Sequence, residues 1–449
     1  MPSRQTQSVL EERNERGSMR LTNSKALKIG ILDHMGYGNL GDAATQDVAI
    51  ANIRKRLPNA TLIGFSFVPS DTTARHGIPC YPIRAWYPKS AKTEDSSAAV
   101  NDNKSRLKEF IKSIPFAQRL VKPILECGRQ ALFLVRSYRA VRTLDVLIIS
   151  GGGQLSDLWR GPWSHPFSIF QFCLLAKLAG RKLYVLNVGA GPLDHRLSKF
   201  FAKHAVQLAD YCSFRDDESQ ALIRSLGVKS ETHVYPDLAY ALPIEEIVES
   251  PLRVSSVPVV GLNPIGFCDP RNWARKDQAI YREYLQKMVR FSAWLLEQGY
   301  LLRIFTNETS LDKYVIEDLT AELRSRTTSE MFGRIFWNTS ETVNDVLREM
   351  SEFDFVVTSK YHGIIFSQVL GKPVISLSYH KKMDSAMRAL GQERFNANIQ
   401  SFDVDWLIHA FRLLMEEREG IRWKSATVVK EYAARLSQQF DSIFLPESF

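Results

Sequence analysis

Short apolar runs alternate with helix-like stretches along most of this 449-residue chain, and this alternation restricts the possible folds more than any other feature. The runs of the first half lie at 27–33, 61–68, 145–150, 182–189 and 211–216. Runs that are apolar on both faces are typical of parallel strands covered by helices on each side. The first half is therefore predicted to form a doubly wound α/β domain over residues 26–243.

The same alternation restarts in the second half, after a polar stretch at 244–258 that contains serine and proline and is predicted to be a linker. The later apolar runs lie at 259–264, 300–307, 334–338, 355–359 and 373–379. They predict a second Rossmann-like domain over 259–403, followed by helices over 404–449 that pack back on the first domain. Ligands of open parallel sheets bind beyond the carboxyl ends of the strands, so a cleft between the domains is the expected site.

The net charge restricts the possible classes of ligand, and the cysteines indicate the cellular compartment. The formal net charge is +9 and the isoelectric point is near 9.2, which favours anionic ligands or an anionic surface. Basic and aromatic residues do not interleave as they do in single-strand-binding platforms, so no nucleic-acid partner is expected. The five cysteines are scattered without the spacing of zinc ligands. They indicate reduced thiols in a cytoplasmic protein, and no metal site is expected.

Two segments lie outside the alternation. Residues 1–25 are polar and lack the apolar core of a secretory signal, so they are expected to be a disordered lead-in. An insertion at about 100–142 contains ten Lys or Arg against two Glu over 104–142, in an amphipathic, helix-like pattern. It is either a helical insertion with a solvated basic face or an element that contacts an anionic membrane surface or a lipid-linked substrate. The second interpretation places the protein peripherally at the inner membrane face.

The first apolar run is followed by the loop GYGNLGD, residues 36–42. Its glycines permit positive φ angles and close approach of the backbone to a ligand. Asn39 or Asp42 can cap a helix that begins near Ala43, and the amides of that helix would face an anion. The loop lacks the Lys-Ser/Thr of a P-loop and the spacing of a dinucleotide site. It is either a tight structural turn or a ligand-binding loop, and the two polar side chains exceed what a turn requires.

Other strand ends in the first half also carry glycines or charges. Gly152 and Gly153 belong to a glycine triplet whose amides can close on a phosphate or a carboxylate. Arg215 suits bidentate binding of an anion, or an ion pair with one of the two aspartates that follow it. Asp237 either caps and braces a loop or acts as an acid/base group.

In the second half, polar residues gather in the stretch 358–383. Lys360 and His362 follow an apolar strand where a helix begins, a position that core packing explains poorly. Tyr379, Lys381 and Lys382 follow the next strand at the same edge of the sheet. Asn263 ends the first strand of this domain. Basic groups from two strand ends would form an anion pocket that faces the glycine loops of the first domain.

Taken in order, these motifs resemble the polysaccharide pyruvyl transferase family over roughly residues 26–395. The motifs are GYGNLGD, SGGGQLSD, GAGPL, FRDDES, YPDLAYALP, GLNP and SKYHGIIFSQVLGKPVISLSYHKKM. The resemblance implies a GT-B-like fold, with two facing Rossmann-type domains around a cleft. It also implies transfer of a pyruvyl group from phosphoenolpyruvate to two hydroxyls of a sugar, as a cyclic ketal. The acceptor would be a glycan that is free, lipid-linked or polymeric.

The resemblance also assigns residues. The positions that match family motifs are Asn39, Gly41, Asp42, Gly152, Gly153, Arg215, Asp216 and His362. The family often has arginine where this chain has Lys360, and lysine retains the charge but loses the bidentate fork.

These positions lead to an expected mechanism. His362 is predicted to be the general acid/base, with Asp42 or Asp237 as its carboxylate partner. The groups expected to bind the donor's two anionic groups are the glycine-loop amides, Arg215, Lys360 and Lys381. No metal or other cofactor is expected to be obligatory. Two alternatives stay open: a GT-B nucleotide-sugar glycosyltransferase, and a non-catalytic relative that binds carbohydrate or membrane.

Overall fold

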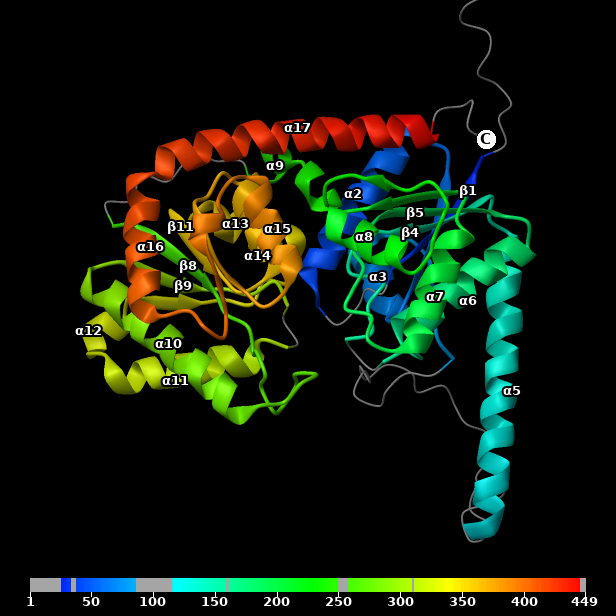
Figure 1. The fold of residues 1–449 in the computed structure, drawn as a ribbon, viewed down its shortest axis with the longest axis horizontal. Helices are drawn as coiled ribbons and strands as arrows, with labels where there is room; N and C mark the ends of the chain where they lie inside the picture. The colour runs from blue at the N-terminus through cyan, green and yellow to red at the C-terminus, as the bar shows by residue number, and fades with distance from the viewer. Residues whose placement is uncertain are drawn as a thin grey trace, which may run out of the picture.

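Two parallel sheets with helices on both faces form the two halves of the molecule (Figure 1). The computed structural model describes residues 26–33, 38–85, 115–158, 161–248, 257–308 and 311–444. The predicted lead-in, the insertion before residue 115, most of the predicted linker and the first two residues of the GYGNLGD loop lie outside the described residues. The predicted α/β class with two doubly wound sheets is confirmed.

The first sheet has seven parallel strands in the order β3-β2-β1-β4-β5-β6-β7. The strands are β1 Lys28–Leu32, β2 Thr61–Ser66, β3 Cys80–Pro82, β4 Val146–Ser150, β5 Lys182–Val188, β6 Tyr211–Phe214 and β7 His233–Val234. The helices are α2 Leu40–Arg56, α3 Pro69–His76, α5 Pro115–Arg142, α6 His165–Leu178, α7 Arg196–Gln207, α8 Asp217–Ser225, η2 Leu238–Ala241 and α9 Ile244–Ile247.

Burial on both faces explains why these strands are apolar throughout. In β4 of the first sheet, Val146 and Ile148 pack into a core that includes α2, whereas Leu147 and Ile149 pack into a second core on the opposite face. Strand residues point alternately to the two faces, so a strand covered on each side needs an apolar side chain at every position. The second core contains residues of α5, α6 and α7. The central strands β1 and β4 are therefore inaccessible except at their ends.

The second sheet has six parallel strands in the order β10-β9-β8-β11-β12-β13. The strands are β8 Val259–Asn263, β9 Leu301–Ile304, β10 Ile335–Trp337, β11 Phe355–Thr358, β12 Val374–Ser378 and β13 Asn396–Asn398. The helices are α10 Gln278–Glu297, α11 Lys313–Arg326, α12 Ser329–Phe332, α13 Val343–Ser351, α14 Tyr361–Val369, α15 Lys381–Ala389 and η3 Glu393–Phe395.

Both sheets change winding direction at a central pair of strands, β1/β4 in the first and β8/β11 in the second. In open parallel sheets, the crevice at such a switch point is the usual ligand site. The loop after β1 leads into α2, and the turn after β11 leads into α14. The two helices therefore begin at the switch points of the two sheets.

The C-terminal helices are α16 Val404–Glu416 and α17 Arg418–Phe444, and α17 runs across both halves (Figure 1). At its far end, Arg56 of α2 donates from Nε to Asp441 at 2.8 Å. The Gln439 amide donates to Asn187 of β5 and to Ser213 of β6, at 2.7 and 2.9 Å. Helix α17 therefore begins at the second half of the molecule, and its far end is hydrogen-bonded to the first half.

The described part of the insertion, 115–142, is one helix, α5, which packs against α6 and extends away from the rest of the molecule (Figure 1). Phe133 and Val141 of α5 are buried in the second core of the first sheet. Along the stretches of chain that the structure describes, no helix combines the length and the apolar character needed to cross a bilayer.

Candidate active site

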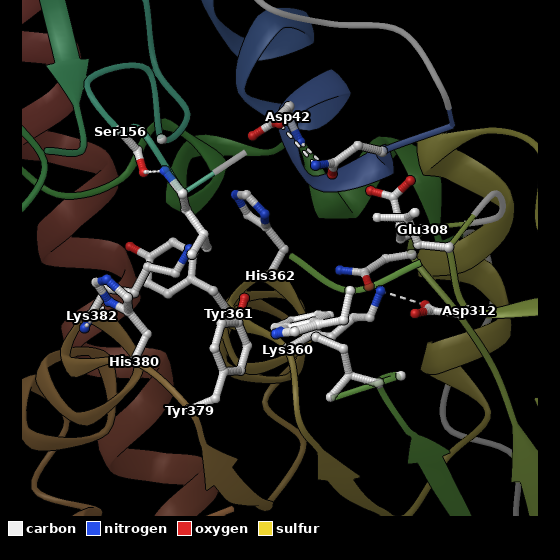
Figure 2. Close-up of a pocket in the computed structure, with 18 of the residues that line it drawn as sticks. Asp42, Ser156, Glu308, Asp312, Lys360, Tyr361, His362, Tyr379, His380 and Lys382 are labelled. Carbon is white, nitrogen blue, oxygen red and sulfur yellow. Dashed lines mark hydrogen bonds and ion pairs between the residues drawn. The ribbon is translucent and has the colours of Figure 1, made fainter. Parts of the chain in front are cut away.

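The two halves meet where α2 and α14 begin, and a cleft of about 200 Å³ lies between them (Figure 2). The backbone amide of Leu40 donates to the carbonyl of Asn307 at 2.9 Å, and Asn39 forms a β-bridge with Glu308. The first helix of one domain is thus attached directly to the loop after β9 of the other. Residues from both switch points line the cleft, as the strand-end argument predicts.

Asn39 caps α2, and its side chain orients the first turn of that helix. The Asn39 oxygen accepts hydrogen bonds from the backbone amides of Gly41 and Asp42, at 3.1 and 3.2 Å. Its amide donates to Asp42 Oδ2 at 2.8 Å. Asn39 and Asp42 both line the cleft. The cap fixes the Asp42 carboxylate at the positive end of the helix dipole, beside the cleft.

Gly41 lets the two helix starts approach each other closely. A Cβ at residue 41 would lie 1.9 Å from Nδ1 of His362 and 2.3 Å from its Cγ. Because no real side chain tolerates such contacts, any other residue at this position must displace the imidazole. The glycine of the GYGNLGD loop is therefore required by a histidine more than 300 residues later in the chain.

His362 lies in the first turn of α14 with its imidazole buried between the two domains. Its Nε2 is 4.0 Å from Asp237 Oδ2, and no described residue forms a hydrogen bond with this nitrogen. Burial lowers the pKa of His362, and the negative charges of Asp237 and Asp42 oppose that shift. The imidazole is therefore neutral at neutral pH, in the form that accepts a proton.

Arg215 is buried beside His362 and held on three sides. Its Nη1 donates to Asp237 Oδ2 at 3.2 Å, and its guanidinium stacks over the Tyr361 ring at 4.4 Å. A Cβ at Gly189 would lie 2.6 Å from the guanidinium, so this glycine makes room for the arginine. Asp216 Oδ2 lies 3.6 Å from Arg215 Nε. Both interpretations of Arg215 hold geometrically, since it forms intradomain ion pairs and also lines the cleft.

Asp237 connects the arginine and the histidine. Its Oδ1 accepts from the backbone amide of Ala239 at 3.0 Å and caps η2, while Oδ2 faces both Arg215 and His362. The side chain is buried. Asp237 therefore braces a loop and is the carboxylate closest to the free nitrogen of the histidine. It is held rigidly, as a partner that orients an imidazole must be.

Lys360 lines the cleft, but its charge is already paired. Its ammonium forms an ion pair with the buried Asp312, which also accepts a hydrogen bond from the Thr306 hydroxyl. Burial raises the pKa of Asp312, and Lys360 opposes the shift. Figure 2 shows this pair on the side of the cleft formed by the second domain. Lys360 thus differs from the free anion-binding cation that the sequence predicts.

Of the two lysines predicted at this strand end, Lys382 faces the cleft from α15, whereas Lys381, the one expected to bind the donor, does not. Lys381 is exposed and does not line the cleft, because the helix begins at this residue and turns its side chain outward. Lys382 Nζ lies 5.3 Å from the centre of the Tyr361 ring. Burial, and then the positive charge of Arg215, lowers the pKa of Lys382 to about 8.

Asn263 lies below the cleft and does not line it. Its amide donates to the carbonyl of Phe305 at 3.0 Å, and its oxygen accepts from the Thr358 hydroxyl at 2.8 Å. These bonds join β8 to the ends of its two neighbouring strands. The predicted substrate contact is thus replaced by a structural role.

The three glycines of the triplet after β4 have different roles. Gly151 and Gly152 have positive φ angles of 52° and 63°, and the Gly152 carbonyl accepts from the amide of Gly189 at 2.7 Å. Gly153 lines the cleft. Gly152 therefore shapes the loop, while Gly153 borders the cleft.

Several cleft residues lie outside the sequence predictions. They include Ser156, Trp273, Glu308, Asp312, Tyr361 and His380. Tyr361 lies between the predicted residues Lys360 and His362, so its place in the cleft could have been predicted from the sequence. Asp312 follows β9, and only the fold shows that it pairs with Lys360. In the described ranges, His, Cys, Asp and Glu do not form a group of three that could hold a metal ion.

The two facing sheets and the cleft at their switch points define a GT-B-type fold, and solved structures agree. A UDP-GlcNAc 2-epimerase from Methanocaldococcus jannaschii has a TM-score of 0.53 at 11% identity, covering 87% of this chain and 93% of that one. A trehalose-6-phosphate synthase has a TM-score of 0.51 at 11% identity, covering 93% and 99%. At this identity the likeness shows the fold alone. Comparison with curated proteins finds no match.

The family is shown by the sequence itself. The model of the polysaccharide pyruvyl transferase family matches residues 39–381. The chain therefore belongs to this family, and the resemblance predicted from the ordered motifs is confirmed.

Proposed function

We propose that the protein transfers a pyruvyl group from phosphoenolpyruvate to two hydroxyls of a sugar in a polysaccharide or oligosaccharide. The observation that carries this proposal is the buried Asp237–His362 pair at the meeting point of two helix N-termini, beside Arg215 and Lys382. Such a site binds anionic groups and moves protons. The family supports a transferase that acts on glycans, and the donor and the ketal product are part of the proposal.

The proposed reaction balances without an oxidant or reductant. A proton adds to C3 of the donor, and a sugar hydroxyl oxygen bonds to C2, which has developed oxocarbenium character. The bond from C2 to the phosphate oxygen breaks, and phosphate leaves with its electron pair. A second hydroxyl then bonds to C2 and closes the ketal. Of the two protons that the hydroxyls release, one replaces the proton delivered to C3 and the other leaves with phosphate.

The residues have separate tasks in this scheme. Neutral His362 accepts the hydroxyl proton, and Asp237 stabilises the imidazolium that forms. Lys382 and Arg215 attract the phosphate and carboxylate of the donor, together with the amides near Gly153. Asp42, the nearest acid on the other helix, adds a second negative charge that stabilises the imidazolium. Lys360 positions the loop that contains Asp312.

We propose no obligatory metal or further cofactor, because the cationic side chains and helix N-termini supply the charge that the donor requires. Retained transfer after treatment with a metal chelator is the expected result. All five cysteines are unpaired, as in cytoplasmic proteins, and we propose that compartment. Fractionation of cells that express the chain tests it.

Ligand-dependent stabilisation separates this proposal from a nucleotide-sugar glycosyltransferase. Phosphoenolpyruvate at a hundredfold excess over its Kd is expected to stabilise the protein by about 2.7 kcal/mol, which raises Tm. A UDP-sugar at the same concentration is expected to leave Tm unchanged. The small cleft favours this outcome, since pockets for drug-sized ligands measure roughly 300–1,000 Å³. Stabilisation by the UDP-sugar alone would favour the glycosyltransferase.

The rate of transfer is expected to show a bell-shaped dependence on pH. Below the lowered pKa of His362 the imidazole becomes protonated and cannot accept the hydroxyl proton, so the rate falls at acid pH. Above about pH 8, Lys382 loses the charge that attracts the donor, so the rate also falls. Lys382→Arg should move the alkaline limb upward, because arginine stays protonated. An alkaline limb that stays in place would exclude Lys382.

Gly41→Ala is expected to lower kcat strongly while the protein still folds. The new methyl group would occupy the space of the His362 imidazole, and a displacement of about 1 Å at a catalytic group costs about a hundredfold in rate. Gly420→Ala is the matched control, because a Cβ at that helical position contacts nothing within 4 Å. Steady-state kinetics with circular dichroism of both variants make the comparison. Equal kcat values would show that the close approach is unimportant.

A further inference from the structure

Helices α5, α6 and α7 form one layer on the outer face of the first domain (Figure 1). Phe133 of α5 packs edge-on against Phe172 of α6, with ring centres 6.5 Å apart. Phe170 of α6 packs in the same way against Phe200 of α7, at 6.0 Å. The exposed side chains of this layer do not line the cleft, and the proposed reaction does not use them.

The exposed apolar side chains of the described residues concentrate on this layer. Twelve large apolar side chains are exposed, and seven of them belong to the layer or to the turn before α6. The seven are Leu132, Val135, Trp163, Leu174, Leu178, Leu197 and Phe200. Leu178 and Trp163 are exposed to 65% and 62%. Single exposed apolar residues are ordinary, whereas such a concentration marks an interaction surface.

The same layer also has a large excess of positive over negative side chains. Residues 126–142, 163–181 and 194–207 contain nine Lys or Arg and two acidic residues, while the whole chain has a net charge of +9. Among the nine, Lys177 pairs with Asp210. The described residues provide no ion pair for the four arginines of α5 in the first of these ranges. The layer is therefore strongly cationic.

The apolar and cationic residues of α5 share one face. Four exposed residues of α5 have the i, i+3, i+4, i+7 spacing of a single helical stripe. They are Leu132, Val135, Arg136 and Arg139. Arginine and tryptophan are also enriched at protein–protein interfaces, so the observation that favours a bilayer is the excess of nine Lys or Arg over two acidic residues across the layer. Helices that lie in the plane of an anionic bilayer have this composition, with apolar side chains in the acyl region and cations among the headgroups.

We infer that the outer face of the α5–α6–α7 layer docks on an anionic lipid bilayer. Leu132, Leu178 and Trp163 enter the interface, and the arginines of α5 contact the lipid phosphates. Tryptophan is favoured at this depth because its ring is apolar and its N–H remains solvated. The inference is independent of the transfer reaction, and docking would bring the cleft to glycans that are anchored to lipid.

Sedimentation with vesicles tests the inference directly. The full chain is expected to bind vesicles of phosphatidylcholine with phosphatidylglycerol, and to bind pure phosphatidylcholine at least tenfold more weakly. Arg136→Gln/Arg139→Gln should weaken binding about tenfold or more, since each cation near an anionic surface contributes about a fivefold factor. Leu132→Gln/Leu178→Gln should weaken it similarly. The effect of the arginines should diminish as salt increases, because salt screens exposed charges.

The controls change exposed arginines and an exposed apolar residue outside the layer. Arg282→Gln/Arg290→Gln alters two exposed arginines of α10, and Trp423→Gln alters an apolar side chain of α17 that is exposed to 74%. Both controls should bind vesicles like the wild type, and every variant should keep the stabilisation by phosphoenolpyruvate. Equal loss in controls and test variants would overturn the inference, as would absence of binding to anionic vesicles. A wild-type dimer that Leu132→Gln/Leu178→Gln dissociates, without lipid binding, would assign the face to self-association.

Discussion

His362→Ala is expected to lower the rate of pyruvyl transfer by about 10²–10⁴-fold, the usual contribution of a positioned acid/base group. The imidazole is buried, neutral, and held 4.0 Å from Asp237. His165 and His380 also line the cleft, but they lie at the starts of α6 and α15 and not at the meeting point of α2 and α14. Phosphate release from phosphoenolpyruvate in the presence of acceptor measures the effect, and kcat should fall more than KM rises.

The matched control is His409→Ala, which removes an exposed histidine of α16. Its kcat should equal that of the wild type. Stabilisation by phosphoenolpyruvate should persist in His362→Ala, because the anion contacts come from other residues. Undiminished transfer by a folded His362→Ala protein would remove the histidine from the mechanism.

The second large effect is on stability. Lys360→Met leaves the Asp312 carboxylate buried without its counter-ion, and breaking a buried ion pair in this way costs about 3–5 kcal/mol of unfolding free energy. Lys360→Met/Asp312→Leu removes both charges and is expected to recover most of that loss. Urea unfolding of the single and double variants measures the difference.

An exposed ion pair provides the comparison. Lys313 and Glu317 lie 3.8 Å apart, with side chains exposed to 69% and 56%. Lys313→Met should change the unfolding free energy by less than about 1 kcal/mol. If Lys360→Met is equally mild, the Lys360–Asp312 pair is not a structural element. Lys360 would then return to the role of a free anion-binding group.

The fold was largely predictable from the sequence because its strands are buried on both faces. A strand such as Val146–Ser150 needs apolar residues at every position, and such runs are visible without a structure. The short edge strands β3, β7 and β13 were missed, because two or three residues at the rim of a sheet carry no periodicity.

The site was predicted at the level of its loops but not of every side chain. Asn39 and Arg215 come together because parallel strands end at the same edge of a sheet, and His362 joins them from the second sheet because the two sheets face each other. Whether a polar side chain at such an end points into the cleft or away from it can change from one residue to the next along the chain. Lys382 faces the cleft while Lys381 faces solvent, and Asn263 turns inward to bind backbone. Sequence patterns do not show which of two neighbouring side chains faces the cleft.

The most direct test of the central claim is mass spectrometry of glycans after incubation with the protein and carbon-13-labelled phosphoenolpyruvate. The glycans are isolated from cells that lack the chain, so that acceptor positions are unmodified. The proposal predicts a glycan that gains the mass of a labelled pyruvate ketal, with one phosphate released per ketal, and no such product with His362→Ala. Glycans without label, together with sugar transfer from a UDP-sugar by the same protein, would contradict it.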